Sequence, residues 1–477
     1  MGYVILSLLI INLILTISMI FIERRKPESI ISWLAILTFL PILGFLLYIL
    51  FGSGLSIKTR HMLKRKILYE DAYEKFMWEE AKRISTLLPS EQELVNYNLS
   101  ASRNMPYFDN SVKIFTNGKD KIKDLKKDLL NAKHSINMEY YIFDDEGVGV
   151  EIMEILCQKA REGIKVKLIY DSVGSLRAPR RFFKRLKKAG GEVAEFFPPL
   201  FSIRLINFKM NYRNHRKIVV IDGQVGYVGG INLRDDHMGK KKKLSPWRDT
   251  HLKIEGNAVY ALQNAFFNDW FFCKKQNLSS MELVARGYFP EVRKDGNVAV
   301  QVLCSGPESK VQYIKDSYVK MITSATKQII IQTPYFIPDD IFISALKQAI
   351  KCGVKVILMI PRKPDKRIVY LATLSYARDM VENGAEVYLY NGFLHSKLFM
   401  VDDTCVSIGT CNTDNRSFAL NFEITTLLYS KHFIKRTMDM IKEDLKNSLQ
   451  VDLTYFKQKP LTNKLGQTFF RLFAPLL

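Results

Sequence analysis

Residues 214–222 read NHRKIVVID and residues 395–402 read HSKLFMVD, so the chain carries two copies of His-x-Lys-x-x-x-x-Asp. In both copies a glycine follows seven residues after the aspartate, and an asparagine follows three residues after that glycine. Residues two apart on an extended strand point to the same face, so each histidine and its lysine should lie side by side. The repeat therefore predicts two strands that each present an imidazole and an ammonium group.

The sequence around the two motifs is also duplicated. Each copy reads as strand, helix, strand, helix, strand and motif strand, with short Val/Ile-rich runs bounded by glycine. Strands that alternate with helices favour an α/β layered fold with a largely buried sheet. We therefore predict two α/β sandwich halves related by a duplication. The matching segments are 132–145 and 325–340, 163–168 and 353–358, and 190–193 and 384–387.

Two uncharged apolar runs precede this region, at residues 2–22 and 30–51. Each has about 20 residues, the length that a helix needs to cross a bilayer. A signal peptide followed by a core helix is the alternative, but no basic residue precedes the first run and no small-residue cleavage site follows it. We therefore predict two transmembrane helices. The predicted domains are a two-helix anchor at 1–52, a juxtamembrane linker helix at 53–106, and the two halves at 107–292 and 293–477.

The charge of the chain bears on its location and partners. Three basic residues lie between the apolar runs and a larger cluster lies at 58–66, which favours a cytoplasmic catalytic region in a cell-membrane protein. The net charge of +22 favours anionic partners: nucleic acid, acidic lipid surfaces or phosphorylated substrates. A hydrophobic content of 47% excludes wholesale disorder. The six cysteines are scattered without zinc-site spacing, so we expect reduced thiols.

The residue types in the motifs suit the transfer of a phosphodiester. Lys217 and Lys397, with the glycine turns, can hold the non-bridging oxygens and stabilise the added charge of the transition state. One of His215 and His395 can attack phosphorus, while the other protonates the leaving alkoxide and later deprotonates the incoming alcohol. We expect no cofactor and no metal ion, because the lysines supply positive charge and few acidic residues lie near the motifs.

Four acidic residues are candidates for orienting the histidines. Asp222 and Asp402 end the motifs, and each either orients a histidine or fixes the turn that follows. Asp249 and Glu423 come later, just ahead of strand-like runs at similar places in the two halves. These two are the better candidates for holding a histidine tautomer, and a surface or core salt bridge is the alternative.

The duplicated motif followed by Gly-x-x-Asn resembles the signature of the phospholipase D superfamily. Flanking residues extend the resemblance to one branch, the bacterial cardiolipin synthases, over essentially the whole chain. It implies a pseudo-twofold fold with one active site between two phospholipase D-like halves, and it makes the first histidine the nucleophile. The stretches that carry it are 211–217, 247–251, 333–339, 392–397, 412–418 and 420–423.

The activity implied by this resemblance is transphosphatidylation, in which two phosphatidylglycerol molecules give cardiolipin and glycerol through a phosphohistidine. Phospholipid hydrolysis, phosphatidylserine synthesis and nucleic-acid cleavage are the alternatives, although a nuclease would not need the two apolar runs. The expected partners are therefore phosphatidylglycerol, cardiolipin and an anionic lipid surface, with no nucleic acid. The implied catalytic residues are His215, Lys217, Asp222, His395, Lys397 and Asp402, supported by Gly229, Gly230, Asn232, Asp249, Gly409, Thr410, Asn412 and Glu423.

One position departs from the superfamily pattern, and two peripheral segments bear on lipid binding. Gly230 stands where many members carry Ser, so the first half lacks a hydroxyl donor that Thr410 keeps in the second. We therefore expect uneven contacts to the phosphate. The run Lys240–Lys243 should either touch anionic headgroups or form a solvated loop. The C-terminal stretch 469–477 should either lie in the membrane interface or pack against the body.

Overall fold

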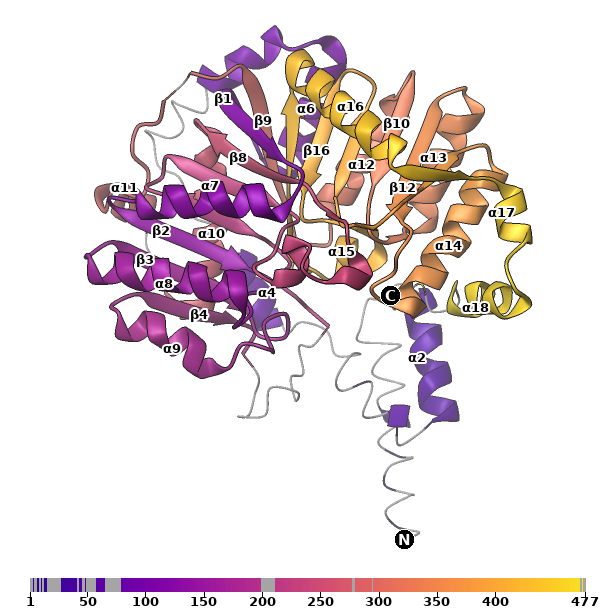
Figure 1. The fold of residues 1–477 in the computed structure, drawn as a ribbon, viewed down its shortest axis with the longest axis horizontal. Coiled ribbons are helices and arrows are strands. Elements are labelled where there is room, and N and C mark those ends of the chain that lie inside the picture. The colour runs from indigo at the N-terminus through magenta and orange to yellow at the C-terminus, as the bar shows by residue number, and fades with distance from the viewer. Residues whose placement is uncertain are drawn as a thin grey trace.

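The computed structural model describes residues 27–40, 43–44, 48, 57–64, 79–198, 211–276, 279–293, 295–471 and 474, with single positions at 3, 7, 10, 13 and 14. In this part of the chain, one continuous sheet contains 15 strands (Figure 1). The sheet strands of the first half are β1 (Pro106–Phe115), β2 (Ser135–Tyr140), β3 (Lys165–Asp171), β4 (Glu192–Phe196), β5 (Ile218–Ile221), β6 (Val225–Gly229) and β8 (His251–Glu255). Those of the second half are β9 (Val298–Ser305), β10 (Gln328–Gln332), β12 (Lys355–Pro361), β13 (Glu386–Tyr390), β15 (Leu398–Val401), β16 (Cys405–Gly409), β18 (Glu423–Tyr429) and β19 (Ser448–Val451).

The order of the strands makes the duplication visible. From the centre outward, the first half runs β1-β8-β6-β5-β2-β3-β4 and the second runs β9-β18-β16-β15-β10-β12-β13, with β19 added at the edge. The two halves meet where β1 and β9 pair antiparallel. The predicted α/β fold with two duplicated halves is therefore confirmed, whereas the domain boundaries at 106 and 292 stay a prediction.

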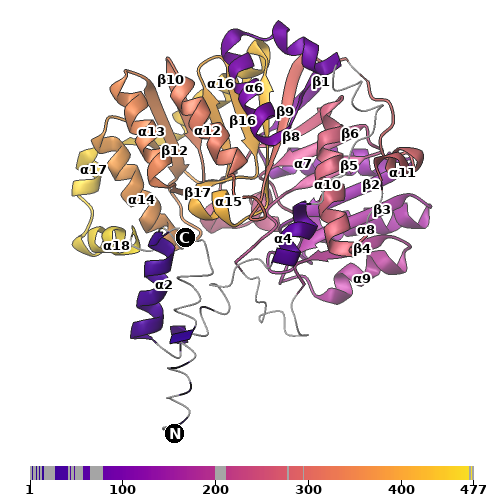
Figure 2. The ribbon, with the colours of Figure 1, turned by 180° about the vertical axis from the view of Figure 1, so that it is seen from behind.

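Helices cover both faces of each half (Figures 1 and 2). In the first half, α7 (Gly118–Leu130), α8 (Gly147–Arg161) and α9 (Arg180–Lys188) lie on one face and α10 (Ala258–Lys274) lies on the other. In the second half, α12 (Tyr313–Ser324), α13 (Asp340–Lys351) and α14 (Arg367–Glu382) lie opposite α16 (Lys431–Lys446). The shorter elements are η3 (Asp235–Met238), η4 (Lys242–Leu244), β7 (Trp247–Arg248), α11 (Ser280–Ala285), β11 (Phe336–Ile337), β14 (Phe393–Leu394), β17 (Thr413–Asp414), α15 (Asn415–Ala419), α17 (Leu453–Lys457) and α18 (Leu461–Arg471).

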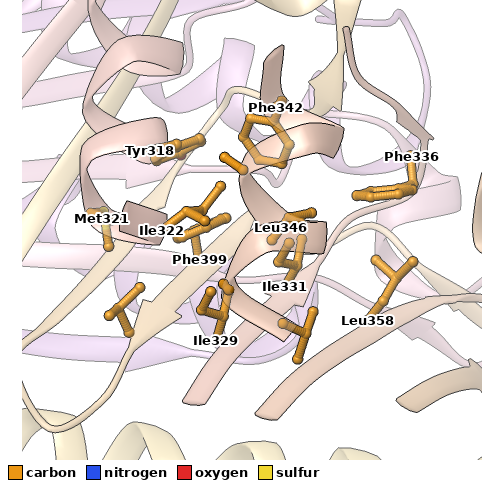
Figure 3. Packing of buried hydrophobic residues seen from close by; sticks show 14 of the residues in the cluster. Tyr318, Met321, Ile322, Ile329, Ile331, Phe336, Phe342, Leu346, Leu358 and Phe399 are labelled. Carbon is orange, nitrogen blue, oxygen red and sulfur yellow. The ribbon is translucent and has the colours of Figure 1, made fainter. Parts of the chain in front are cut away.

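The motif strands β5 and β15 lie inside their halves, and every residue of both is buried. Alternate residues pack on opposite faces of the sheet. On β15, Phe399 packs with Tyr318 of α12 and Phe342 of α13, as Figure 3 shows, whereas Met400 joins the cluster on the other face. A strand that is packed on both faces cannot slip by one residue, because its whole side-chain pattern would invert. The core thus fixes the position of the motif residues next to it.

The His-x-Lys pairs lie just ahead of these strands, which corrects the prediction that they lie on them. β5 begins at Ile218 and β15 begins at Leu398, one residue after the lysine in each motif. The preceding residues leave the large sheet and pair with the opposite half, as the bridge between Asn214 and Phe422 shows. Each motif therefore begins beside a segment of the opposite half and continues as a strand of its own half.

The N-terminal region is described only in part. Most of the first apolar run lies outside the described residues, whereas 14 of the 22 residues of the second run are described. Helix α2 (Pro27–Phe39) covers the start of the second run, and α4 (Ile57–Lys64) follows that run. Among the residues that the structure does describe, no helix combines the length and apolar character needed to span a bilayer. The predicted linker helix at 53–106 is not continuous, because η2 (Arg83–Thr86) ends before α6 (Pro89–Ser102) begins. Pro89 disfavours a helical residue before it and starts the new helix.

Candidate active site

The two histidine motifs are held by backbone contacts to the opposite half of the chain. The N–H of His215 donates to the carbonyl of Phe422 at 2.9 Å, and the N–H of His395 donates to the carbonyl of Arg248 at 2.6 Å. Next to the second contact, β14 pairs in parallel with β7. Each motif therefore reaches across the junction between the halves by the same kind of hydrogen bond, which brings the two histidine motifs to one junction.

A buried carboxylate from the opposite half contacts each histidine. The two oxygens of Glu423 lie 2.9 and 3.0 Å from Nδ1 of His215, and Oδ2 of Asp249 lies 2.6 Å from Nδ1 of His395. Both acids are fully buried. An Nδ1–H that donates to a carboxylate leaves the Nε2 lone pair able to attack phosphorus or to accept a proton. The sequence left a histidine contact or a salt bridge as the alternatives for these acids. The structure shows the histidine contact, and each acid comes from the half opposite to its histidine.

Burial keeps both imidazoles neutral at neutral pH. It lowers the pKa of His215 to about 4, although Glu423 opposes the shift. Burial, and then the charge of Lys397, lowers the pKa of His395 well below its usual value. Burial would raise the pKa of Asp249, but His395 and Lys397 outweigh it and hold that pKa well below the ordinary range. A neutral imidazole has a free lone pair, and the carboxylate beside it stabilises the cation once a proton or phosphorus is bound.

The two motif lysines are buried beside the histidines. Each Nζ donates to the carbonyl of the histidine two residues earlier, at 2.5 Å. Burial lowers the pKa of Lys217 to about 7 and that of Lys397 to about 8, and the charge of Lys397 further disfavours protonation of Lys217. An anion near both lysines would favour their protonated forms. The pair is therefore suited to a bound phosphodiester.

The motif aspartates do not contact the histidines. The carboxylate of Asp222 accepts the backbone N–H groups of residues 133–135 at 2.7–2.9 Å, and that of Asp402 accepts those of residues 326–328 at 2.8 Å. Both aspartates have a positive φ, 55° and 48°, in the turn after the motif strand. The sequence allowed these aspartates either to orient a histidine or to fix the turn. In the structure they fix the turn, and they link each motif strand to the start of the neighbouring strand.

The Gly-x-x-Asn turns are shaped by the close approach of the chain that carries the acids. A Cβ at Gly229 would lie 2.5 Å from the Cα of His251, and one at Gly409 would lie 2.4 Å from the carbonyl oxygen of Ile424, so neither turn has room for a side chain. Asn232 accepts the backbone N–H of Ile142 at 3.2 Å. Asn412, its counterpart, is buried at the equivalent place. The two glycines therefore let the segments that follow Asp249 and Glu423 lie directly against the turns.

The structure gives a different reason for Gly230 than the sequence suggested. A Cβ at this position would lie 2.0 Å from Oδ1 of Asp249. At the equivalent position, the hydroxyl of Thr410 donates to Oε2 of Glu423 at 2.5 Å. The absence of a hydroxyl at Gly230 therefore reflects how the two acids pack against the turns. Asp249 occupies the space that Gly230 leaves, and the Thr410 hydroxyl is committed to Glu423.

His237 belongs to the site, although the sequence motifs did not predict it. It lies on η3, is buried, and its ring centroid is 5.1 Å from that of His395 and 4.2 Å from that of Trp247. Its Nδ1 lies 3.7 Å from Oδ2 of Asp249 and accepts the backbone N–H of Asn232 at 3.3 Å. The only signal in the sequence was a histidine five residues after the Gly-x-x-Asn asparagine, where the second half has a serine.

Among the described residues, His237, Asp249 and His395 form a group that could hold a metal ion, since their ligand atoms lie within 4.8 Å of one another. Two features oppose a cation there. The carboxylate oxygen of Asp249 already pairs with His395. The positive charge of Lys397 also acts on this pair. The arrangement is better suited to holding an imidazole than to binding a metal.

Aromatic rings border both histidines. Tyr141 packs edge-on against His215 with centroids 4.9 Å apart, and its ring lies 5.3 Å from Nζ of Lys217. Trp247 and Phe393 lie 5.3 and 5.7 Å from the ring of His395. These rings limit the positions open to the imidazoles, and they lower the local dielectric, which strengthens the electrostatic contacts of the site.

Known families match both the catalytic region and the N-terminal region. The family described as "Cardiolipin synthase, PLD-like domain" matches residues 125–270 and 318–445, which include both motifs. The family described as "Phospholipase_D-nuclease N-terminal" matches residues 10–53, the region of the two apolar runs. Each of the two matches of the first family falls within one half of the sheet.

Individual proteins are similar over the full length. The chain is 40% identical to the Major cardiolipin synthase ClsA of Bacillus subtilis over 490 residues, covering 98% of each chain. It is also 40% identical to the Cardiolipin synthase of Listeria monocytogenes serotype 4a, covering 100% of this chain and 99% of the relative. The crystal structure of phosphatidylserine synthase from Haemophilus influenzae shares the fold, with a TM-score of 0.62 at 15% identity over 80% of this chain and 97% of that one. The chain belongs to the bacterial cardiolipin synthases of the phospholipase D superfamily.

Proposed function

We propose that this membrane enzyme is a phosphatidyltransferase that joins two phosphatidylglycerol molecules into cardiolipin and releases glycerol. The observation that carries the proposal is the pair of histidines whose Nδ1 atoms each contact a buried carboxylate of the opposite half. Such a site can supply one imidazole as the nucleophile and the other as the acid and base, which a reaction in two displacement steps requires. The similarity to the cardiolipin synthases of Bacillus and Listeria supports the choice of lipid.

In the first step, Nε2 of His215 attacks the phosphorus of one phosphatidylglycerol. The bond between phosphorus and the headgroup glycerol oxygen breaks, and a phosphatidyl-histidine forms. The leaving alkoxide takes a proton from His395, whose imidazolium is stabilised by Asp249. The bound phosphodiester anion supports this protonation, because negative charge nearby raises the pKa of an imidazole. Lys217 and Lys397 stabilise the charge on the non-bridging oxygens.

In the second step, a headgroup hydroxyl of another phosphatidylglycerol gives its proton to Nε2 of His395 and attacks phosphorus. The phosphorus–nitrogen bond breaks, which releases cardiolipin and returns His215 to its neutral form. Each proton that His395 gives in the first step is regained in the second, so the cycle is balanced without a cofactor.

The assignment of the nucleophile rests on the family resemblance and is supported by an asymmetry between the two acids. Asp249 lies closer to its histidine, at 2.6 Å, and a second imidazole, His237, lies beside it. Glu423 is shared among His215, Thr410 and Asn421. A short contact to one carboxylate suits the histidine that must hold a proton, which favours His395 as the acid and base.

We further propose that the two N-terminal apolar runs anchor the enzyme in the cell membrane with the catalytic region on the cytoplasmic side. The family match at residues 10–53 and the basic cluster after the second run support this arrangement. Protease treatment of sealed vesicles tests it, because cleavage of the catalytic region from the outer face would contradict the orientation.

A product assay tests the reaction itself. Purified enzyme should convert phosphatidylglycerol, as sole lipid and with a chelator present, into equal amounts of cardiolipin and glycerol. Phosphatidic acid as the only lipid product would show that water, not a lipid alcohol, accepts the phosphatidyl group. No turnover without an added divalent cation would contradict the role given to the two lysines.

A further inference from the structure

A basic cavity separate from the catalytic histidines is lined by residues of both halves. It has a volume of about 360 Å³ and lies between the loop around η4, the start of α14 and the start of α18. The first half supplies Lys243, and the second supplies Asp365, Arg367, Tyr370, Lys459 and Asn463. None of these residues belongs to the histidine motifs or contacts the catalytic histidines in the part of the chain that the structure describes.

The charges of this cavity favour an anion. Lys240 and Lys241, on the same loop, pair with Asp235 and Asp236 at 2.9 and 3.5 Å. Lys243 and Arg367 have no acidic partner within ion-pair distance among the described residues. The one lining carboxylate, Asp365, accepts the hydroxyl of Tyr335 at 2.5 Å. With Lys459 the lining carries three positive charges and one negative charge, so a phosphodiester would meet a net positive lining.

Helix α18, which begins beside the cavity, presents an apolar face outward. Leu461 and Leu465 are 69% and 61% exposed, and Phe469 is 54% exposed. Residues four apart lie on one face of a helix. The opposite face is docked on α14, where Gly466 meets Leu371 and Arg471 pairs with Asp379 at 3.4 Å. The helix is therefore fixed to the body while its apolar side chains point away from it.

The position of this face indicates what covers it. α18 lies at the same end of the molecule as α2 in both views (Figures 1 and 2). At the C-terminal end of α2 and just after it, Phe39, Leu40 and Leu43 are also exposed, by 82%, 49% and 53%. The exposed apolar face of α18 lies beside the basic cavity, to which α18 contributes Asn463. This arrangement matches a bilayer with anionic headgroups, in which apolar groups enter the interface and cations meet phosphates.

We propose that the cavity binds the headgroup phosphodiester of a second anionic phospholipid, one that does not react, while the exposed face of α18 lies in the bilayer interface. The proposal rests on the proposed function only in taking a phospholipid bilayer as the enzyme's substrate phase. No covalent bond forms or breaks at this site. Its effect is to hold the catalytic junction at the lipid surface, so it contributes to apparent affinity and not to the chemical steps.

The test uses the full-length enzyme in neutral detergent micelles that contain increasing mole fractions of phosphatidylglycerol. The variant is Lys243→Gln/Arg367→Gln. The matched control is Lys240→Gln/Lys241→Gln, which removes two charges from the same region but not from the cavity. The cavity variant should raise the apparent KM for phosphatidylglycerol by about 30-fold, at the usual contribution of two basic residues near an anionic surface, with kcat unchanged. The control should shift KM by no more than about threefold.

Further measurements separate the possible failures. Short-chain phosphatidylglycerol dissolved below its micelle concentration should be turned over equally by the wild type and the cavity variant. A loss there would place the cavity in the reaction centre and overturn the proposal, as would equal KM shifts in both double variants. Competition by millimolar inorganic phosphate that disappears in the cavity variant would assign the site to free phosphate instead. Leu461→Ser/Leu465→Ser should also raise KM in micelles but not for the dissolved lipid, and an unchanged KM would overturn the role of α18. Failure of the wild type to make cardiolipin at all would count against the proposed function and not against this site.

Discussion

Replacement of Glu423 by glutamine is the sharpest test of how the site works. The carboxylate accepts three donors: Nδ1 of His215, the hydroxyl of Thr410 at 2.5 Å and the side-chain amide of Asn421 at 3.1 Å. Glutamine has one acceptor oxygen, so it cannot satisfy all three. If its NH₂ group faces His215, that histidine must accept at Nδ1, and the proton moves to Nε2, the atom that should attack phosphorus.

The size of the effect follows from the bond that is lost. A charge-assisted hydrogen bond contributes about 3 kcal/mol when a cation develops on the histidine, which corresponds to about 150-fold in rate. Glu423→Gln should therefore lower kcat by about 100-fold or more, with the fold intact by circular dichroism. Thr410→Val is the matched control, because it removes one donor but keeps the carboxylate, and kcat should fall by less than about tenfold. A fall of less than fivefold in Glu423→Gln would refute the orienting role of this acid.

Rapid quenching with a radiolabelled phosphatidyl group then distinguishes the two acids. Glu423→Gln should suppress the burst of phosphatidyl-enzyme, because it impairs the histidine that attacks. With a substrate whose glycerol is replaced by an activated leaving group that needs no proton, Asp249→Asn should leave release of that group in the first turnover less affected, and the intermediate should accumulate. The opposite pattern would exchange the roles of His215 and His395. A covalent intermediate in neither variant nor the wild type would remove the phosphohistidine from the mechanism.

Three further predictions concern the lysines, the motif aspartate and the turn. The pKa of Lys217 is lowered to about 7 and that of Lys397 to about 8, so kcat/KM should decline as pH rises through 7–8. The value of kcat should decline only at higher pH, because bound phosphate favours the protonated lysines. Identical pH profiles for kcat and kcat/KM would contradict this. Asp402→Ala should lower the free energy of unfolding by about 3 kcal/mol, measured in urea, because three backbone N–H groups lose a charged acceptor, and the kcat of the folded fraction should change less than tenfold. Gly230→Ala should lower kcat at least tenfold in the product assay, because the new Cβ would lie 2.0 Å from Oδ1 of Asp249 and must displace that carboxylate. Wild-type activity in this variant would show that Asp249 can move without consequence.

The sequence was sufficient for the fold because the duplication and the Val/Ile-rich runs are local signals. Strand β15 reads as a buried strand from its own four residues, and the spacing to the glycine turn repeats in the other half. The exact start of each strand was not predictable in this way. His215 and Lys217 read as part of β5, but they leave the sheet because residues 214 and 422 pair across the junction, and that partner is about 200 residues away in the chain.

The site shows the same division between local and distant information. Asp249 and Glu423 could be singled out by their matched positions, but which histidine each one contacts depends on how the halves meet. The role of Asp222 was open because an aspartate at the end of a motif can face either way, and only the positions of residues 133–135 decide it. His237 has no motif around it and no counterpart in the second half, so its spacing from Asn232 was the only sign of it in the sequence.

The exchange of acids between halves has a consequence for the whole enzyme. If each half supplied both the histidine and its acid, the two motifs could be separated without loss of either pair. Here His215 without Glu423, and His395 without Asp249, would be buried imidazoles with no carboxylate to stabilise their cations. The acids would in turn be left as buried charges, which is among the costliest arrangements in a protein interior. The same hydrogen bonds that prepare the histidines for chemistry therefore also hold the halves together, so the site can be complete only when the junction is closed.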